Sequence, residues 1–339
     1  MATTDNPAEP IPAVPLDYTV CYSTMHQGPC STATFNYDGR YAASGSYDTT
    51  VKVLDVAKMN LRSNHIEDKP MIQALYDQSD RVNDLAFHPN GMVLATCSAD
   101  RQIKLYDMMR PKVKWSIQHF QDSHPVLAIS FHPSGDFLAA AAQSAPSIRL
   151  FDVKTFQGYT ASRNPDDQHT SGGIRQVRFA DNGSHMVTAG DDDAIKIWDI
   201  VSGSCVKTLE KAHGGNGVST AQFSRNGKYI LSSGRDSSAK LWETTSGKLV
   251  HTFKGAAHTK FHVPAAFNYN ESLVFSIDED RHQVCYWDSK TGAFVGQWAA
   301  HNCPINWLAT SPTDSGLLTC GDDNKIKYWT APSSSSTEA

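Results

Sequence analysis

One short stretch decides the fold, and it reads Ile230-Leu231-Ser232-Ser233-Gly234-Arg235-Asp236-Ser237-Ser238-Ala239-Lys240-Leu241-Trp242-Glu243. Its first half is a short strand-like run that ends at Ser233-Gly234, and a polar turn with Asp236 follows. Its second half alternates up to an aromatic residue and an acid. A strand, a tight polar turn and an alternating strand together predict a β-hairpin.

The same hairpin pattern recurs along the chain, so the stretch is one copy of a repeat. Seven copies close at intervals of 42 to 52 residues, on Leu54, Tyr106, Phe151, Trp198, Trp242, Trp287 and Trp329. A period of about 40 to 45 with a Trp-Asp ending resembles the WD repeat, whose copies each form four strands of a propeller blade. The sequence therefore predicts an all-β, seven-bladed WD40 β-propeller.

The repeats run nearly from end to end, which favours one domain over the two that a length of 339 residues suggests. We expect a flexible Pro-rich tail over 1–16, the propeller over 17–330 and a flexible Ser-rich tail over 331–339. A lone strand at Tyr18 to Tyr22 precedes the first complete repeat, and the last repeat has no fourth strand of its own. Because an open ring leaves strand edges unpaired, we expect this lone strand to complete the last blade.

Composition and charge exclude several classes of function. The net charge of −5 and the pI near 6.3 argue against binding of nucleic acid over a broad basic surface. The seven cysteines include no C-x-x-C pair, which favours reduced thiols in the cytosol or nucleus. The chain has no signal-peptide core and no apolar run of the about 20 residues that span a membrane. Phosphate-binding and nucleophile-elbow motifs are absent, and we expect no cofactor.

A set of Ser, His and Asp residues occurs at Ser233, His213 and Asp236, next to Trp242. Acids occupy the same position, six residues before the closing residue, in four other copies: Asp48, Asp100, Asp192 and Asp323. A catalytic triad occurs once in an enzyme, so this repetition favours a structural hydrogen-bond network between each hairpin turn and the preceding loop. We expect no catalytic residue. We also expect no metal site at His258 and His262, because the Glu of H-E-x-x-H is absent.

Basic residues recur two positions before most closing residues, at Lys52, Lys104, Arg149, Lys196, Lys240 and Lys327. They can be interpreted as a cationic ring. We expect instead that each aliphatic stem lies along its blade and that each charge reaches water.

Partner-binding residues are expected on the loops that rim one mouth of the ring. Arg81, Arg175, Asn302 and Trp307 lie near the starts of first strands, and ordinary packing or solvent exposure is the alternative interpretation. Lys260 lies between Gly255 and Pro264, where the repeat pattern is irregular. Irregular loops often carry function, so Lys260 joins these candidates. The connection from Val56 to Tyr76 is also unusually long and predicts an insertion on the outer edge of the first blade.

Several stretches are more specific than a generic WD repeat and resemble the WD-repeat subunit of the cleavage stimulation factor. They are His26-Gln27-Gly28-Pro29-Cys30, Leu85-Ala86-Phe87-His88-Pro89, Ser130-Phe131-His132-Pro133-Ser134-Gly135-Asp136-Phe137 and Asn164-Pro165-Asp166-Asp167-Gln168-His169-Thr170. The last is the most informative, because it lies in a connection between blades, where generic repeats vary. The resemblance covers about residues 18 to 330.

This resemblance implies a non-enzymatic nuclear scaffold in messenger-RNA 3′-end cleavage and polyadenylation. It implies docking on the helical-repeat scaffold subunit of the complex, and the RNA polymerase II C-terminal repeat is a further expected partner. RNA contact is expected to be indirect, through a subunit with an RNA-recognition motif. The family's helical N-terminal dimerisation domain does not fit in the 16 residues before the propeller, so we do not expect a homodimer through that domain.

The alternative function is a substrate receptor of a cullin-type ubiquitin ligase, in which a Trp-Asp-x-Arg ending serves the adaptor. Trp287-Asp288-Ser289-Lys290 comes near this pattern but has Lys in place of Arg. A Lys cannot replace the planar fork of Arg, which weakens the alternative. An enzyme is the third class and ranks last, because no reactive set stands outside the repeat pattern.

Overall fold

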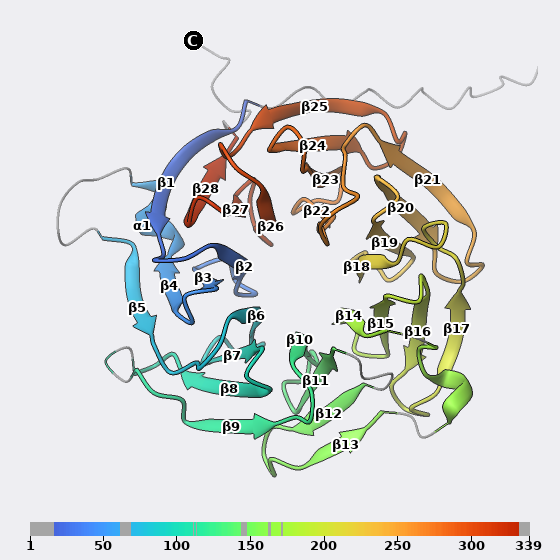
Figure 1. The fold of residues 1–339 in the computed structure, drawn as a ribbon, viewed down its shortest axis with the longest axis horizontal. Helices are drawn as coiled ribbons and strands as arrows, with labels where there is room; N and C mark the ends of the chain where they lie inside the picture. The colour runs from blue at the N-terminus through green and yellow to red at the C-terminus, as the bar shows by residue number, and fades with distance from the viewer. Residues whose placement is uncertain are drawn as a thin grey trace, which may run out of the picture.

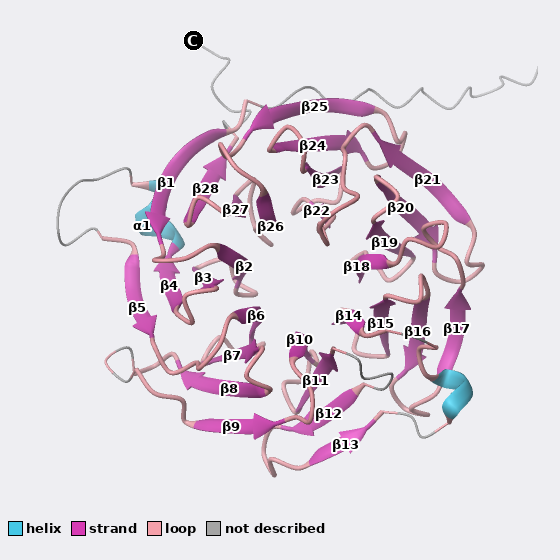
Figure 2. Ribbon diagram, in the orientation of Figure 1, coloured by secondary structure: helices cyan, strands magenta, loops and turns pink. Residues whose placement is uncertain are grey.

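The structure is a computed structural model that describes residues 17–61, 69–110, 112, 114–143, 148–161, 164–170 and 172–331. The tails expected at 1–16 and 331–339 lie outside these residues, apart from Ala331. Strands dominate this part of the chain, and its helical segments are the short α1 (Val56–Asn60) and a 3-10 turn at Pro165–Asp167 (Figure 2).

Within the described residues, the strands form seven antiparallel four-stranded sheets, arranged as blades around a central axis (Figure 1). Blade 1 consists of β2 (Cys30–Phe35), β3 (Tyr41–Ser46), β4 (Val51–Asp55) and β5 (Met71–Leu75). Blade 2 consists of β6 (Val82–Phe87), β7 (Val93–Ser98), β8 (Gln102–Asp107) and β9 (Gln118–Gln121). Blade 3 consists of β10 (Val126–Phe131), β11 (Phe137–Ala142), β12 (Arg149–Asp152) and β13 (Gly158–Thr160). Blade 4 consists of β14 (Ile174–Phe179), β15 (His185–Gly190), β16 (Ile195–Asp199) and β17 (Cys205–Leu209). Blade 5 consists of β18 (Val218–Phe223), β19 (Tyr229–Gly234), β20 (Ser238–Glu243) and β21 (Leu249–Lys254). Blade 6 consists of β22 (Ala266–Phe267), β23 (Leu273–Asp278), β24 (Gln283–Asp288) and β25 (Phe294–Ala299). Blade 7 consists of β26 (Ile305–Thr310), β27 (Leu317–Gly321), β28 (Lys325–Thr330) and β1 (Thr19–Met25). The predicted seven-bladed propeller is confirmed.

The ring closes through the N-terminal strand, as the sequence predicts. Strand β1 pairs antiparallel with β28, and Val20 lies opposite Trp329. Figure 1 shows the blue β1 on the rim beside the red β28. Just before β1, the Tyr18 ring stacks on Trp298 of blade 6, with ring centroids 4.5 Å apart. Strand β28 therefore has a partner on both sides, and β1 is the outer strand of blade 7, as the fourth strand is in every other blade.

Polar side chains near the axis join neighbouring blades. The second residue of a first strand donates to the first residue of the next blade in three places: Ser31 to the Val82 carbonyl at 2.5 Å, Asn83 to Val126 at 2.7 Å and Asn306 to Cys30 at 3.0 Å. The third residue accepts a backbone N–H of the next blade, from Ile129 to Asp84 and from Ala221 to Gln176. These bonds hold the first strands in a fixed register around the channel, so that equivalent residues lie at equivalent depths.

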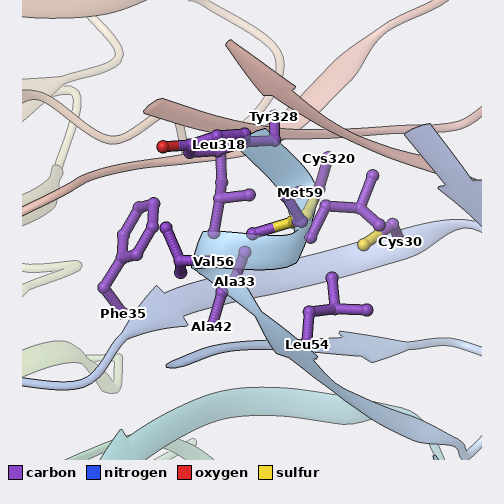
Figure 3. Packing of buried hydrophobic residues seen from close by; sticks show 11 residues of the cluster. Cys30, Ala33, Phe35, Ala42, Leu54, Val56, Met59, Leu318, Cys320 and Tyr328 are labelled. Atoms are coloured by element: carbon purple, nitrogen blue, oxygen red, sulfur yellow. The ribbon is translucent and has the colours of Figure 1, made fainter. Parts of the chain in front are cut away.

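The insertion of blade 1 contains a helix that the sequence analysis does not predict. Helix α1 starts at Asp55, whose carboxylate accepts the Lys58 N–H at 3.2 Å. Its Val56 and Met59 are buried in a hydrophobic cluster with residues of blades 1 and 7, which include Leu318 and Tyr328 (Figure 3). The helix thus covers the seam at which the ring closes. Residues 62–68 of the same connection lie outside the described residues.

Candidate functional site

The Ser-His-Asp set of blade 5 forms a chain of hydrogen bonds that starts at a tryptophan. Trp242 Nε1 donates to Ser232 Oγ at 2.9 Å, and Ser232 Oγ lies 2.9 Å from His213 Nε2. His213 Nδ1 lies 2.7 Å from Asp236 Oδ1, so this nitrogen donates to the carboxylate. This series of hydrogen bonds joins the two strands of the hairpin to the loop that precedes the blade.

The assignment of Ser233 to this network is wrong, because Ser232 takes that place. Successive side chains of a strand point to opposite faces, so only one of the two serines faces Trp242. Ser233 Oγ instead donates to the Val263 carbonyl of blade 6 at 2.5 Å and lies 2.7 Å from Thr220 Oγ1. Ser233 therefore joins two blades, whereas Ser232 joins the parts of one.

Among the described residues the complete series of hydrogen bonds recurs in blades 4 and 7, where Thr replaces Ser. Asp192 and Asp323 bind His169 and His301 at 2.8 and 2.9 Å, and these histidines lie 2.9 and 2.8 Å from the threonines. Asp48 reaches His26 through Thr50, with bonds of 2.6 and 2.8 Å. Asp100 differs, because Gln78 stands at the histidine position and Asp100 accepts the N–H groups of Ser79 and Gln102. A chain of bonds that recurs in this way is structural.

The turn that carries Asp236 has a strained backbone, which the carboxylate supports. The residue after each turn aspartate has a positive φ without being glycine, as in Ser237 at 57° and Asn324 at 64°. The carboxylate accepts the Ser238 hydroxyl at 2.7 Å and the Lys240 ammonium at 2.9 Å. Burial alone raises the pKa of Asp236, but the bond from His213 and these others outweigh it and lower that pKa well below its usual range.

The expectation that every basic residue before a closing position sends its charge to water is wrong for at least four of them. The ammonium groups of Lys240 and Lys327 donate to the carbonyls of Ala212 and Ala300, at 2.7 and 2.6 Å. Each of these carbonyls belongs to the residue just before the network histidine. Lys52 and Lys104 bind Met25 and Asp77 carbonyls in the same way. These residues are therefore part of the structural network, not a free cationic ring.

The candidate partner-binding residues gather at one mouth of the channel. A cavity of about 290 Å³ at this mouth is lined by Arg81, Arg175, Lys260 and Trp307, together with Tyr47, Phe261, His262 and Asn306. Asn302 is exposed on the connection before β26 and is not among the lining residues. Four of the five predicted residues, which come from four blades, thus share one cavity.

The charged side chains of the mouth are held by specific partners. Arg175 Nε donates to Asp191 at 2.7 Å, and Lys260 Nζ donates to Asp280 at 3.0 Å. Arg81 lies over the Tyr47 ring, 5.5 Å from its centroid. The Glu279 carboxylate accepts the backbone N–H groups of Thr259, Lys260 and Phe261, at 2.7 to 3.1 Å, and so fixes the irregular loop of blade 6.

Comparisons with known proteins decide the family. The sequence model described as "WD domain, G-beta repeat" matches residues 19–55, 70–107, 115–152, 165–199, 203–243 and 292–330. "Cleavage stimulation factor subunit 50" of Arabidopsis thaliana is 39% identical over 306 residues, which are 90% of this chain and 71% of that relative. The chain belongs to the cleavage stimulation factor subunit 50 family of WD40-repeat proteins. The resemblance drawn from the sequence is therefore confirmed.

Other similar proteins are more distant from this cleavage stimulation factor subunit 50 family member. "Transcriptional corepressor LEUNIG_HOMOLOG" of Arabidopsis thaliana is 26% identical over 299 residues, which are 87% of this chain and 34% of that protein. Among solved structures, the Cps50 (Swd1) β-propeller domain of Myceliophteria thermophila matches with a TM-score of 0.77 and 16% identity, covering 93% of this chain and all of that one. This likeness shows the shared fold alone. The first three strands of blade 6, β22 to β24, fall between two matches of the WD model, in keeping with the short two-residue β22.

In this WD40-repeat protein the mouth contains a second set of Ser, His and Asp, but it forms no proton relay. His262 Nδ1 lies 3.3 Å from Ser219, whereas its Nε2 lies 4.0 Å from Asp191, beyond hydrogen-bonding distance. Asp191 already binds Arg175. Burial, and then the Arg175 charge, lower the pKa of His262 to about 4. The residues that the structure describes contain no group of three or more His, Cys, Asp or Glu side chains placed to hold a metal ion, and no helix among them is long and apolar enough to cross a membrane.

Proposed function

We infer that this chain is a non-enzymatic scaffold in pre-mRNA 3′-end cleavage and polyadenylation, as the WD-repeat subunit of a cleavage stimulation factor complex. One observation carries the proposal: the identity of 39% to a cleavage stimulation factor subunit extends over 90% of the chain. Likeness over so much of the chain covers the blades and their connections, not only the hydrogen-bond network that any WD repeat needs. The nucleus is the corresponding place of action.

Partner docking is assigned to the mouth lined by Arg81, Arg175, Lys260 and Trp307, with Asn302 on the loop beside it. The supporting observation is their convergence on one cavity, with aromatic walls and charged side chains. Aromatic and arginine side chains are the residues that most often dominate protein interfaces. The helical-repeat scaffold subunit is the proposed direct partner, with the RNA polymerase II C-terminal repeat as a further one. RNA is reached through the subunit with the RNA-recognition motif.

No observation favours the cullin-ligase receptor. Its adaptor contact needs an Arg where this chain has Lys290. The preceding Asp288 is used internally, since its carboxylate accepts the N–H groups of Lys290 and Thr291 at 3.0 and 2.8 Å.

Affinity purification of the tagged chain from nuclear extract at moderate salt tests the proposal, with identification of the proteins that accompany it. We expect the helical-repeat and RNA-recognition-motif subunits. A Lys290→Ala variant serves as control and should recover the same proteins. Recovery of a cullin adaptor without those subunits, and its loss from the Lys290→Ala variant, would contradict the proposed function.

A further inference from the structure

The mouth carries four cationic side chains, although the net charge of the whole chain is −5 and the carboxylates of Asp191, Glu279 and Asp280 lie beside it. Arg81, Arg175 and Lys260 line it from blades 2, 4 and 6 or their connections, and Arg235 of blade 5 lies near the lining residue His262. Arg235 lies in the turn between β19 and β20, and its charge lowers the pKa of His262 together with that of Arg175, after the larger effect of burial. Arg81 and Arg235 belong to blades 2 and 5, which lie on opposite sides of the ring (Figure 1), so these two cations approach the opening from different directions.

Two of these cations have no carboxylate partner. Among the described residues, Arg175 and Lys260 form ion pairs with Asp191 and Asp280, whereas Arg81 and Arg235 form none. Arg81 is held over the Tyr47 ring. Arg235 is held by one bond, from its Nε to the Asn216 carbonyl at 2.9 Å. Both guanidinium groups therefore retain donors for a negatively charged ligand.

Arg175 occupies a position that serves a structural purpose in other blades. Ser31, Asn83 and Asn306 stand at this second position of a first strand and bind the next blade. Arg175 instead turns its Nε to Asp191 of its own blade, 2.7 Å away. In the described part of the chain no acceptor binds its terminal nitrogens. Among the described residues Arg175 therefore contributes a cation to the mouth and no bond to the next blade.

The walls of the cavity determine the shape of that ligand. Tyr47, Phe261 and Trp307 line a space of about 290 Å³, and Phe261 and Tyr47 are 44% and 48% exposed. Such a volume lies at the lower limit of small-ligand pockets, about 300 Å³. It admits a side chain or two from an extended segment, but not a helix.

We propose that the mouth binds an extended acidic peptide segment of a partner protein. Separate carboxylates of the segment pair with Arg81 and Arg235, and an apolar side chain enters between the aromatic walls. Separate cations match separate carboxylates, whereas a single phosphate dianion needs donors that converge. This inference rests on the proposed function, in that it specifies the chemistry of the docking segment.

Selection from a phage-displayed library of random peptides tests the chemistry with the purified full chain. We expect selected peptides to be enriched in Asp and Glu, and their binding to weaken as salt rises. The double variant Arg81→Gln/Arg235→Gln should weaken binding of a selected peptide by about tenfold or more. Arg40→Gln is the matched control, because Arg40 is highly exposed in the turn after β2, at the opposite end of that strand from the mouth. It should leave binding unchanged.

Enrichment of neutral or basic peptides, or full binding by the double variant, would overturn the inference. So would binding that tightens about tenfold when a selected peptide carries phosphoserine in place of one Glu, because the ligand would then be a phosphate. Nuclear-extract purification of the wild-type chain keeps the two proposals separate. Recovery of processing subunits without acidic enrichment refutes only this inference, and acidic enrichment without those subunits refutes only the proposed function.

Discussion

At the scale of single residues, Asp236 supports the hairpin from three sides. Its carboxylate binds His213, Ser238 and Lys240, and the strained Ser237 follows it. We expect Asp236→Ala to lower the free energy of unfolding by about 1 to 3 kcal/mol, since each buried donor loses its acceptor. Urea unfolding measures this loss. Asp100→Ala is the control and should lose less, because Asp100 binds no histidine; an equal loss would contradict the role of the His-Asp bond.

The lowered pKa of His26 predicts that the stability of the fold depends on pH. Burial lowers its pKa to about 4, against about 6.5 in the unfolded chain. The unfolded chain thus binds more protons between these values, so stability is fully present above pH 6.5 and is lost as pH falls towards 4. His26→Gln should reduce the slope in this window by up to about 1.4 kcal/mol per pH unit. Glutamine is a suitable replacement, because Gln78 occupies the same position in blade 2 and binds Thr96. An unchanged slope in urea unfolding series would refute the role of His26.

At the scale of elements, strand β1 is anchored by Tyr18. The ring stacks on Trp298 and packs edge-on against Phe275, at 4.5 and 5.8 Å between centroids. We expect Tyr18→Ala to cost about 2 to 4 kcal/mol and to speed hydrogen exchange in β1 and β28 above that of other blades. Val20→Ala, at a 41% exposed position in the same strand, is the control and should change little. Uniform acceleration in all blades would argue against a local anchor.

The sequence predicted the strands well because each copy of the repeat carries its own turn and alternation. Helix α1 was missed because its five residues are too few to show a helical period, although Asp55 stands at its start as a cap. The choice between Ser232 and Ser233 was also missed. Both are small and polar, and only the register of β19 against β20, which pairs Ser232 with Lys240, settles which one faces Trp242.

At the scale of the whole molecule, an ion pair beside the channel joins three blades. Arg178 of blade 4 binds Asp84 of blade 2 at 3.0 Å and the Ile129 carbonyl of blade 3 at 3.0 Å. We expect Arg178→Ala to cost about 2 to 3 kcal/mol, because it leaves the buried Asp84 charge unpaired. The double variant Asp84→Asn/Arg178→Ala should be more stable than Arg178→Ala alone. Arg110→Ala, which removes an exposed pair with Asp107, is the control and should cost no more than about 1 kcal/mol. Additive losses in a double-mutant cycle would refute the coupling.

The candidate site was predicted in part, because the repeat fixes which positions rim the mouth but not which partners their side chains find. Arg235 was missed, although it lies in the stretch that revealed the repeat. The sequence signal that could have identified Arg235 as a residue of the mouth is its position directly before the turn aspartate, Asp236. Tyr47, Asp191 and Asp322 hold the same place in other blades, and they line the mouth or bind residues that do.

The closure of the ring has a consequence for synthesis on the ribosome. Cys21 of β1 bonds to Thr330 of β28, which is 309 residues later in the chain. At about 5 to 20 residues per second, β1 leaves the ribosome roughly 15 to 60 seconds before its partner exists. Blades 1 to 6 have all their strands before then, but the ring cannot close until β28 has been synthesised. Blade 7 forms only after β28 has left the ribosome, and until then β1 lacks its partner strand and can pair with other nascent chains.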